Sequence, residues 1–332
     1  MKISFVIPAY NEEKYLPKCL EAVIKEKKRG KHDIEIIVVN NASTDNTRKV
    51  ILSYPEVILV DEMRKGLAAA RQAGFKASTG DLIANIDSDS ILTPGWTDNV
   101  ISQFTKNPKL VALSGPFIYH DMSMFSNFLV RIWYVLDYGL YLFHRFILRV
   151  SSHLQGGNFI VRRSALEQIG GFDQAFPFWG EDTHIAKQLN PLGPVVFTFK
   201  LPIYSSGRRL KGEGIFKMFY VYAANFFWAI FSDKPFTRDD YSEIRESDFD
   251  KVAFRTTLVN FQRLLFGIKL FVSLFIFTMI GGTAYLYDRT VENVVPITAS
   301  ASEIVVNEKP SLISKIHNKL EAWEARLDKD KK

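Results

Sequence analysis

Short apolar runs alternate with longer amphipathic stretches over the first 115 residues. The runs are rich in Ile and Val, and each ends at polar or turn-forming residues: "ISFVI" (3–7), "IEIIVV" (34–39), "VILV" (57–60), "LIANI" (82–86) and "VALS" (111–114). Segments with helical spacing follow most of these runs. Strands that alternate with helices predict βαβ units, hence a largely parallel sheet with helices on both faces. We therefore expect an α/β fold.

The same pattern continues less regularly between residues 151 and 205. The stretch "GGNFIVRRSALEQIGGF" (156–172) predicts a strand and a short helix, "FWGEDTHIAKQL" (178–189) predicts another helix, and "VVFTF" (195–199) predicts a further strand. We expect the sheet to become mixed near this end and residues 1–210 to form one domain. Ligands of such sheets bind where the strands end at their carboxyl edge.

One long run predicts a membrane span. Residues 270–287 carry no charge, and Leu264 to Ile268 lengthen the run if Lys269 reaches the lipid headgroups. This length suits a transmembrane helix over 264–287, with a buried core helix as the alternative. Basic residues precede the run and mostly acidic residues follow it, so the positive-inside rule predicts a cytoplasmic N-terminal domain and an external tail over 288–332.

Two aromatic stretches predict contact with a membrane surface. The first, from 125 to 150, is a helical insertion (within 120–150) in which Arg131, Arg145 and Arg149 fall on one stripe. The second, 218–231, is too short to cross a bilayer and lies in a predicted interfacial region over 211–262. Both suit the plane of an anionic membrane. Packing inside the domain is the alternative for both.

Composition excludes few classes of function or binding partner. The net charge of +6 suits nucleic acid, anionic lipid or a phosphorylated substrate equally well, but no nucleic-acid-binding motif accompanies it. The 27 Phe and 13 Tyr exceed what an ordinary core needs. Cys19 is the only cysteine, which rules out a disulfide within the chain. We expect Cys19 to pack in a helix.

Two carboxylates close the fourth apolar run. Asp87 and Asp89, in "IANIDSDS", repel each other, so a strand end that keeps both usually has a cation nearby. Hard oxygen ligands favour Mg²⁺ or Mn²⁺ over zinc. A surface turn that caps the next helix is the alternative. The chain has neither G-x-G-x-x-G after its first strand nor a P-loop, which disfavours a dinucleotide-binding dehydrogenase and a P-loop NTPase.

Six ordered blocks resemble a known family. They are "FVIPAYNEEKYLPKCLEAV", "IIVVNNASTDNT", "KGLAAARQAG", "GDLIANIDSDS", "GGNFIVRRSALEQIGGFD" and "GEDTHIAKQL", and they cover about residues 1–210. Together they resemble the family 2 glycosyltransferases of GT-A fold. The resemblance implies a mixed, mostly parallel sheet flanked by helices, a nucleotide-sugar donor, and Mg²⁺ or Mn²⁺ as cofactor.

The resemblance also implies which residues bind the donor and the metal. Asn40 stands where relatives usually carry an Asp that contacts the base, and "KGLAAARQAG" lies along the donor, with Arg71 near phosphate. Asp89 ligates the metal, and Asp87 faces the ribose or the metal's waters. A solvated helix face is the alternative for Lys65. The implied donor-binding residues are Pro8, Tyr10, Glu12, Asn40, Lys65, Gly66, Arg71 and Asp87.

Catalytic and acceptor residues follow in the second half. Asp182 resembles the general base that deprotonates the acceptor, with Glu181 beside it. Helix capping is the alternative for both, as a tight turn is for the glycines of "GGN". Arg208 and Arg209, in "SSGRRLKGEG", match a loop that clamps the diphosphate. The implied acceptor or sugar contacts are Gly156, Gly157, Asn158, Trp179 and His184.

These features predict a membrane-anchored, inverting, metal-dependent glycosyltransferase of cell-envelope polysaccharide or glycolipid synthesis. It would transfer one sugar to a lipid-linked acceptor at the cytoplasmic face, since the Q-x-x-R-W of processive synthases is absent. Its partners would be the donor, the acceptor and membrane lipids, with no nucleic acid. Two alternatives stay open: a polyprenyl-phosphate glycosyl synthase, and a non-catalytic membrane scaffold that retains the fold.

Overall fold

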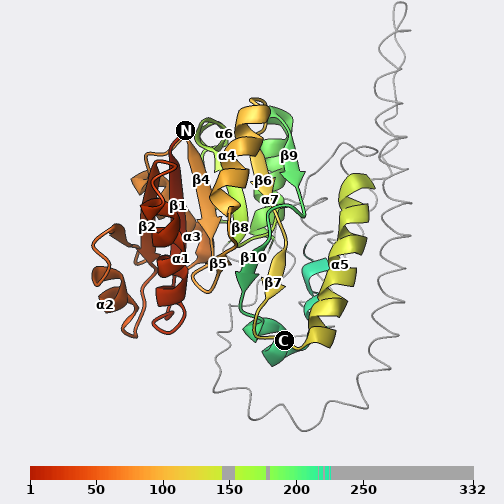
Figure 1. The fold of residues 1–332 in the computed structure, drawn as a ribbon, viewed down its shortest axis with the longest axis horizontal. Helices are drawn as coiled ribbons and strands as arrows, with labels where there is room; N and C mark the ends of the chain where they lie inside the picture. Colours follow the sequence, from red (N-terminus) through yellow and green to blue (C-terminus); the bar gives the residue numbers. More distant parts are fainter. Residues whose placement is uncertain (144–153, 177–179, 216, 220, 224, 226–332) are drawn as a thin grey trace, which may run out of the picture. The chain divides into compact units, whose positions relative to one another are not determined.

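A seven-stranded mixed sheet forms the centre of the computed structural model (Figure 1), which describes residues 1–143, 154–176, 180–215, 217–219, 221–223 and 225. Its strand order is β3-β2-β1-β4-β8-β6-β9. All neighbours pair in parallel except β8, which is antiparallel to β4 and β6. The strands are β1 (Ile3–Ala9), β2 (Ile34–Asn40), β3 (Val57–Asp61), β4 (Leu82–Ile86), β6 (Ala112–Ser114), β8 (Asn158–Arg162) and β9 (Val195–Phe197). The predicted mostly parallel sheet is confirmed.

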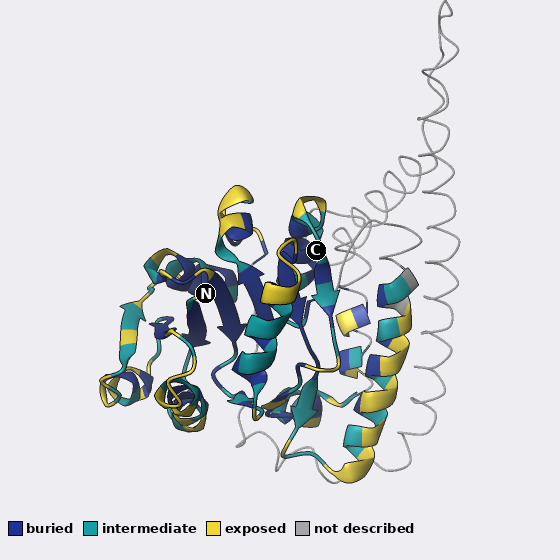
Figure 2. Ribbon diagram, turned by 45° about the horizontal axis from the view of Figure 1, so that its top comes forward, coloured by how far each residue is buried: buried dark blue, intermediate teal, exposed yellow. Residues whose placement is uncertain are grey.

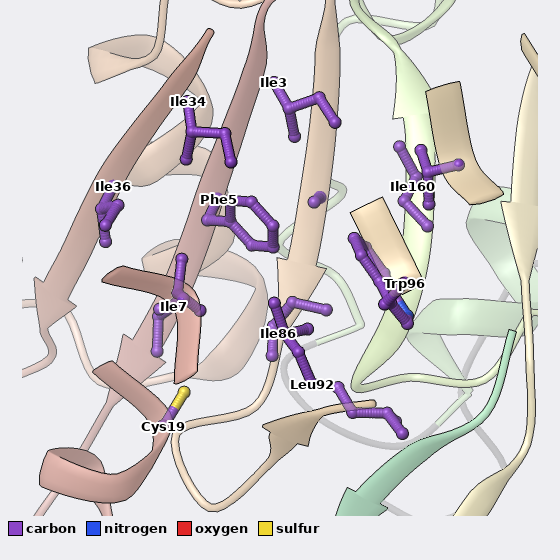
Figure 3. Packing of buried hydrophobic residues seen from close by; sticks show 14 of the residues in the cluster. Ile3, Phe5, Ile7, Cys19, Ile34, Ile36, Ile86, Leu92, Trp96 and Ile160 are labelled. Atoms are coloured by element: carbon purple, nitrogen blue, oxygen red, sulfur yellow. The ribbon is translucent and has the colours of Figure 1, made fainter. Parts of the chain in front are cut away.

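Helices cover both faces of this sheet because successive strand residues point to opposite sides. Phe5 packs with Cys19 and Trp96 on one face (Figure 3), whereas Val6 packs with Phe75 and Ile185 on the other. Figure 2 shows the central strands almost wholly buried. The helices are α1 (Leu16–Lys28), α2 (Thr47–Leu52), α3 (Leu67–Ala77), α4 (Trp96–Lys106), α6 (Arg163–Gln168) and α7 (Glu181–Leu189), and a short 3-10 turn, η2 (Asn190–Leu192), follows α7.

A second, three-stranded sheet brings two distant loops together. Strand β10 (Ile203–Ser205) pairs antiparallel with β5 (Ile91–Leu92) and parallel with β7 (Phe117–Tyr119). Asp89 lies just before β5, and helix α8 (Arg208–Glu213) begins just after β10. The β5–β10 pair therefore sets the start of α8 beside the loop that follows β4.

Helix α5 (Met124–Phe143) has two apolar faces. Val130, Tyr134 and Tyr141 are buried in a cluster with Phe197 and Met218. The opposite face is exposed, with Met124 at 92%, Phe125 at 68% and Val135 at 64%, and it also carries Phe128, Arg131, Ile132 and Leu136. Yellow segments along α5 mark this face in Figure 2. The described part of the predicted aromatic helix is thus helical.

Within the residues described, no helix is both long enough and apolar enough to cross a membrane. The predicted span over 264–287, the tail over 288–332 and most of the 211–262 region lie outside the described ranges, as do Arg145 and Arg149.

Candidate active site

The predicted site residues converge because of the strand directions. Strands β1, β2 and β4 run in parallel, so the residues that follow them lie at one edge of the sheet. Strand β8 runs the opposite way, and its first residue, Asn158, pairs with Ile86 at the end of β4. The glycines that precede β8 therefore meet the aspartates that follow β4.

Gly156 and Gly157 leave room for two carboxylates. A Cβ atom at Gly157 would collide with the carboxylate of Asp87, and one at Gly156 would lie 3.3 Å from Oδ2 of Asp182. The backbone N–H of Asp87 donates to the carbonyl oxygen of Gly157 at 3.3 Å. The missing side chains thus accommodate the protein's own acids, and a sugar's approach to this backbone stays a prediction.

Arg71 contacts two acids of the site, Glu181 and Asp87, from inside the domain. Its guanidinium is completely buried and donates to Oε1 of Glu181 and to the carbonyl oxygen of Gly156, with Oδ1 of Asp87 at 3.4 Å. Burial lowers the pKa of Arg71, against the attraction of Asp87 and Asp182. The side chain therefore organises the site from inside the domain. The predicted contact of Arg71 with phosphate remains untested.

Asp182 lies in the first turn of α7, where the helix dipole stabilises negative charge. Gly180, with φ of 75°, precedes the helix and supplies the left-handed turn that starts it. Oδ1 of Asp182 accepts the N–H of Thr183 at 2.8 Å, while Oδ2 is the atom that faces Gly156. Asp182 is partly exposed, whereas Glu181 is buried against Arg71. Of the two acids, Asp182 is the one that is accessible to solvent.

A second arginine, Arg208, bridges two further acids of the site, Glu12 and Asp89. Arg208 donates from both terminal nitrogens to the carboxylate of Glu12, the Nη1–Oε2 distance being 3.1 Å, and its Nη2 lies 3.3 Å from Oδ2 of Asp89. Oδ1 of Asp89 is 3.5 Å from the hydroxyl of Ser205. The guanidinium also stacks over Tyr15, 4.8 Å from the ring centroid. Glu12, predicted to line the nucleoside, thus forms an acidic pair with Asp89.

Burial makes this acidic pair reluctant to ionise. Desolvation raises the pKa of Glu12 to about 7, with Arg208 opposing the rise and Asp89 adding to it. Desolvation likewise raises the pKa of Asp89 to about 6, against the attraction of Arg208 and with the repulsion of Asp87. Two carboxylates that are costly to charge form a place where added positive charge is strongly favoured.

The donor set at Asp89 fits a hard divalent ion that is held jointly with a diphosphate. Among the residues that the structure describes, no three His, Cys, Asp or Glu side chains form a ready metal cage. Magnesium sites in nucleotide enzymes usually need only one or two carboxylates, because substrate phosphates and water supply the other ligands. Asp89, with Asp87 two residues before it, meets that requirement.

The nucleoside end of the predicted site contains a second group of contacts. Lys65 donates to the hydroxyl of Tyr10 at 2.9 Å and lies 4.8 Å from its ring centroid. Nδ2 of Asn40 donates to Asp61 at 2.8 Å, which turns the amide oxygen of Asn40 toward the N–H of Ser43.

Two further predicted donor-binding residues, Gly66 and Pro8, lie next to or within regular secondary structure. Gly66 is the residue before α3, and its N–H donates to Asn41 at 2.9 Å. Pro8 lies within β1 and is buried.

Of three predicted acceptor contacts, Asn158 and His184 contact other parts of the fold, and Trp179 is not among the described residues. Asn158 is fully buried; its amide donates to the carbonyl oxygens of Gly115 and Leu201, and its oxygen accepts the indole N–H of Trp96. His184 stacks on Phe176, with ring centroids 4.0 Å apart. These contacts hold the fold, so sugar binding by Asn158 or His184 stays a prediction. Trp179 lies outside the described residues.

Sequence reasoning missed two contributors to the site. Tyr222 keeps 39% of its surface exposed, while desolvation of its hydroxyl raises its pKa, opposed by Arg209 and reinforced by the nearby charges of Asp182 and Asp87. Its position in an aromatic run gave no sign of this neighbourhood. Asp121 accepts from Ser206 and from the N–H of Gly207, and thereby anchors the loop that carries Arg208. A lone acid before a helix gives no such signal either.

Two curated proteins are similar in sequence to part of this chain. A dolichyl-phosphate beta-glucosyltransferase of Trichomonas vaginalis is 39% identical over 126 residues, which are 34% of this chain and 38% of the relative. An undecaprenyl-phosphate 4-deoxy-4-formamido-L-arabinose transferase of Proteus mirabilis is 35% identical over 94 residues, which are 26% of this chain and 29% of the relative. The chain thus matches about a third of the length of these curated relatives.

A solved structure with a similar fold is the mannosyltransferase PcManGT from Pyrobaculum calidifontis in complex with GDP-Man and Mn²⁺. It is 19% identical, with a TM-score of 0.51 over 88% of this chain and 87% of its own. At this identity the likeness shows the fold alone, which is of the GT-A type. The model of glycosyl transferase family 2 matches residues 4–170, half of the chain. By this match, which contains the β1, β4 and β8 parts of the site, the chain belongs to glycosyl transferase family 2.

Proposed function

We propose that this chain transfers one sugar from a nucleoside diphosphate sugar to a lipid-linked acceptor, with inversion at the anomeric carbon. The observation that carries the proposal is the convergence of three acids on one edge of the sheet. Asp87 and Asp182 both lie against Gly156–Gly157, and Asp89 follows two residues after Asp87. A scaffold that had lost catalysis would have no need to keep a partly exposed Asp182 beside this site.

The chemistry assigned to the chain's residues is a single displacement. The oxygen of the acceptor hydroxyl attacks the anomeric carbon while Asp182 accepts the proton of that hydroxyl. The bond from the anomeric carbon to the diphosphate oxygen breaks on the opposite face of the sugar. Arg71 keeps Glu181 and Asp87 in place. A divalent ion held by Asp89, with Asp87 beside it, would neutralise charge on the departing nucleoside diphosphate.

The relatives favour a particular acceptor as a second candidate. The names of the two relatives above specify dolichyl phosphate and undecaprenyl phosphate. A polyprenyl phosphate is already ionised at neutral pH, so it needs little help from a base. An Asp182→Asn variant that kept nearly full turnover would therefore favour polyprenyl phosphate, whereas a hundredfold or greater loss would favour a hydroxyl acceptor.

Donor cleavage tests the function without knowledge of the acceptor. The full chain is incubated with UDP-, GDP- and dTDP-sugars in Mn²⁺, together with a membrane lipid extract, and released nucleoside diphosphate is measured. We expect release with one of these donors, its loss on chelation and its loss in Asp89→Ala. Lys217→Gln, in a solvent-exposed pair with Glu213, is the matched control and should retain the wild-type rate. Release that persists in Asp89→Ala would contradict the proposal.

The lipid-linked part of the proposal rests on α5. Its outward face gathers several exposed apolar side chains, with exposed Arg131 beside them, and large exposed apolar patches often mark interaction surfaces. Acyl chains would cover Met124, Phe125 and Phe128, and anionic headgroups would pair with Arg131. The sequence adds the predicted span over 264–287. This arrangement would place the active site at the cytoplasmic membrane surface, where a lipid-linked acceptor is found.

A further inference from the structure

Arg208 lies where a bound cation would be expected. Its guanidinium contacts the carboxylates of Glu12 and Asp89, which come from the loops after β1 and β4. Both acids are largely buried, and Arg208 is the cation that directly pairs with both among the described residues. Without a positive charge between them, the two acids would repel each other in surroundings of low dielectric. In this state Arg208 supplies that charge.

A divalent ion and this guanidinium compete for the same atoms. Oδ2 of Asp89 is engaged by Arg208, and Oδ1 lies near the hydroxyl of Ser205. An ion on Asp89 would meet the positive guanidinium at close range and take over its carboxylate. Because the two positive charges repel each other at this distance, binding of the ion to Asp89 and pairing of Arg208 with Asp89 disfavour each other.

The backbone beneath Arg208 is fixed, so the side chain is the part that can move. Asp121 accepts from the N–H of Gly207 at 2.7 Å and from the hydroxyl of Ser206 at 2.9 Å, and Lys211 pairs with it at 3.1 Å. A Cβ atom at Gly207 would collide with Met122, so the chain is packed tightly at this point. Rotation about the side-chain bonds of Arg208 is the simplest way to free Asp89.

We infer that Arg208 is a positioning residue with two alternative partners: it holds Glu12 and Asp89 before the donor arrives, and it is displaced from Asp89 by the metal to pair with the donor's diphosphate. The identity of that ligand rests on the proposed function. Guanidinium and diphosphate are well matched, since planar N–H groups bind phosphate oxygens in pairs. Metal and nucleotide should consequently bind with positive coupling, each being weak alone.

Mn²⁺ binding tests this inference without any turnover. Free Mn²⁺ is quantified by electron paramagnetic resonance while the full chain is titrated, first alone and then with saturating UDP or GDP. Without nucleotide, Arg208→Gln should bind Mn²⁺ about fivefold or more tightly than wild type, because the competing cation is gone. Nucleotide should strengthen Mn²⁺ binding by wild type more than by the variant. Lys217→Gln should match wild type, and Asp89→Asn should bind little Mn²⁺.

Other outcomes overturn the inference. Equal or weaker Mn²⁺ binding by Arg208→Gln would show that Arg208 does not compete, and absence of Mn²⁺ binding in both proteins would show that no exchange takes place. Should Arg208→Gln fail to fold, Arg208→Lys serves instead: one ammonium cannot bridge both acids as a guanidinium does, so an intermediate affinity is expected. Failure of the proposed function is recognised separately, as the absence of donor cleavage by wild type.

Discussion

At the scale of single residues, the site depends on two arginines with different degrees of burial. Arg71 is completely enclosed and holds Glu181 and Asp87, so its charge is part of the protein's structure. Arg208 is partly exposed and pairs with Glu12 and Asp89, where we propose that a metal ion takes its place on Asp89. Removing the partner of a buried charge typically costs about 3–5 kcal/mol, which makes Arg71 the more sensitive of the two.

Gly157 gives the sharpest single-residue prediction. In Gly157→Ala, the added methyl group would occupy the place of the Asp87 carboxylate, so this side chain must turn away. We expect a folded protein that is destabilised by about 1–3 kcal/mol and has lost donor cleavage at least tenfold. Gly139→Ala is the matched control, because a Cβ atom there would meet nothing within 4 Å. Thermal unfolding and nucleoside diphosphate release measure both effects, and unchanged release in Gly157→Ala would contradict this view of Asp87.

At the scale of elements, the alternation of apolar runs predicted the strands and helices well, whereas side-chain pairing could not be predicted. Phe5 and Val6 follow the period of two, so their opposite faces can be read from the sequence. The family resemblance implies a place near donor phosphate for Arg71, and it gives no sign of the contact with Glu181. Its partner Glu181 is 110 residues away, and Arg208 is 196 residues from Glu12. No local pattern links residues at such separations.

We predict that the exposed face of helix α5 contacts a membrane surface. Cys19 is buried, so a cysteine placed at Phe128 can be labelled selectively with a fluorophore in the full chain. In vesicles that contain anionic lipids, nitroxide quenchers attached to the acyl chains should strongly reduce the fluorescence of a label at Phe128→Cys. A label at Glu21→Cys, on the exposed side of α1, is the control and should be little affected. Equal quenching at both positions, or quenching only at Glu21→Cys, would exclude a membrane contact through this face of α5.

At the scale of the whole molecule, the acidic pair makes stability depend on pH. The pKa of Glu12 is raised to about 7 by burial, above its usual 4.5. The folded state therefore holds more protons than the unfolded state between these values, and this group's stabilisation, fully present below pH 4.5, is lost as pH rises toward and past 7. Asp89 acts in the same direction toward about pH 6.

Thermal unfolding in a metal chelator tests this pH dependence. Between pH 5 and pH 8, we expect Glu12→Gln to gain roughly 2 °C or more in melting temperature relative to wild type, because the amide never has to ionise. Glu213→Gln, which changes an acid outside the Glu12–Asp89 pair, is the control and should follow wild type across the range. A melting-temperature difference between Glu12→Gln and wild type that stays constant with pH would contradict the raised pKa of Glu12.

The chain leaves the central sheet after β6 and returns to it at β8, and the two crossings are adjacent. Ser114 donates from its hydroxyl to the carbonyl oxygen of Asn158 and accepts the N–H of Gln155, both at 2.8 Å. The described part of the segment between β6 and β8, which includes β7 and α5, consequently starts and ends at adjacent points of the sheet. Exchanging this segment for that of another enzyme would therefore also remove β7, the partner of β10, and Asp121, which holds the backbone next to Arg208, so its effects would extend to the active site.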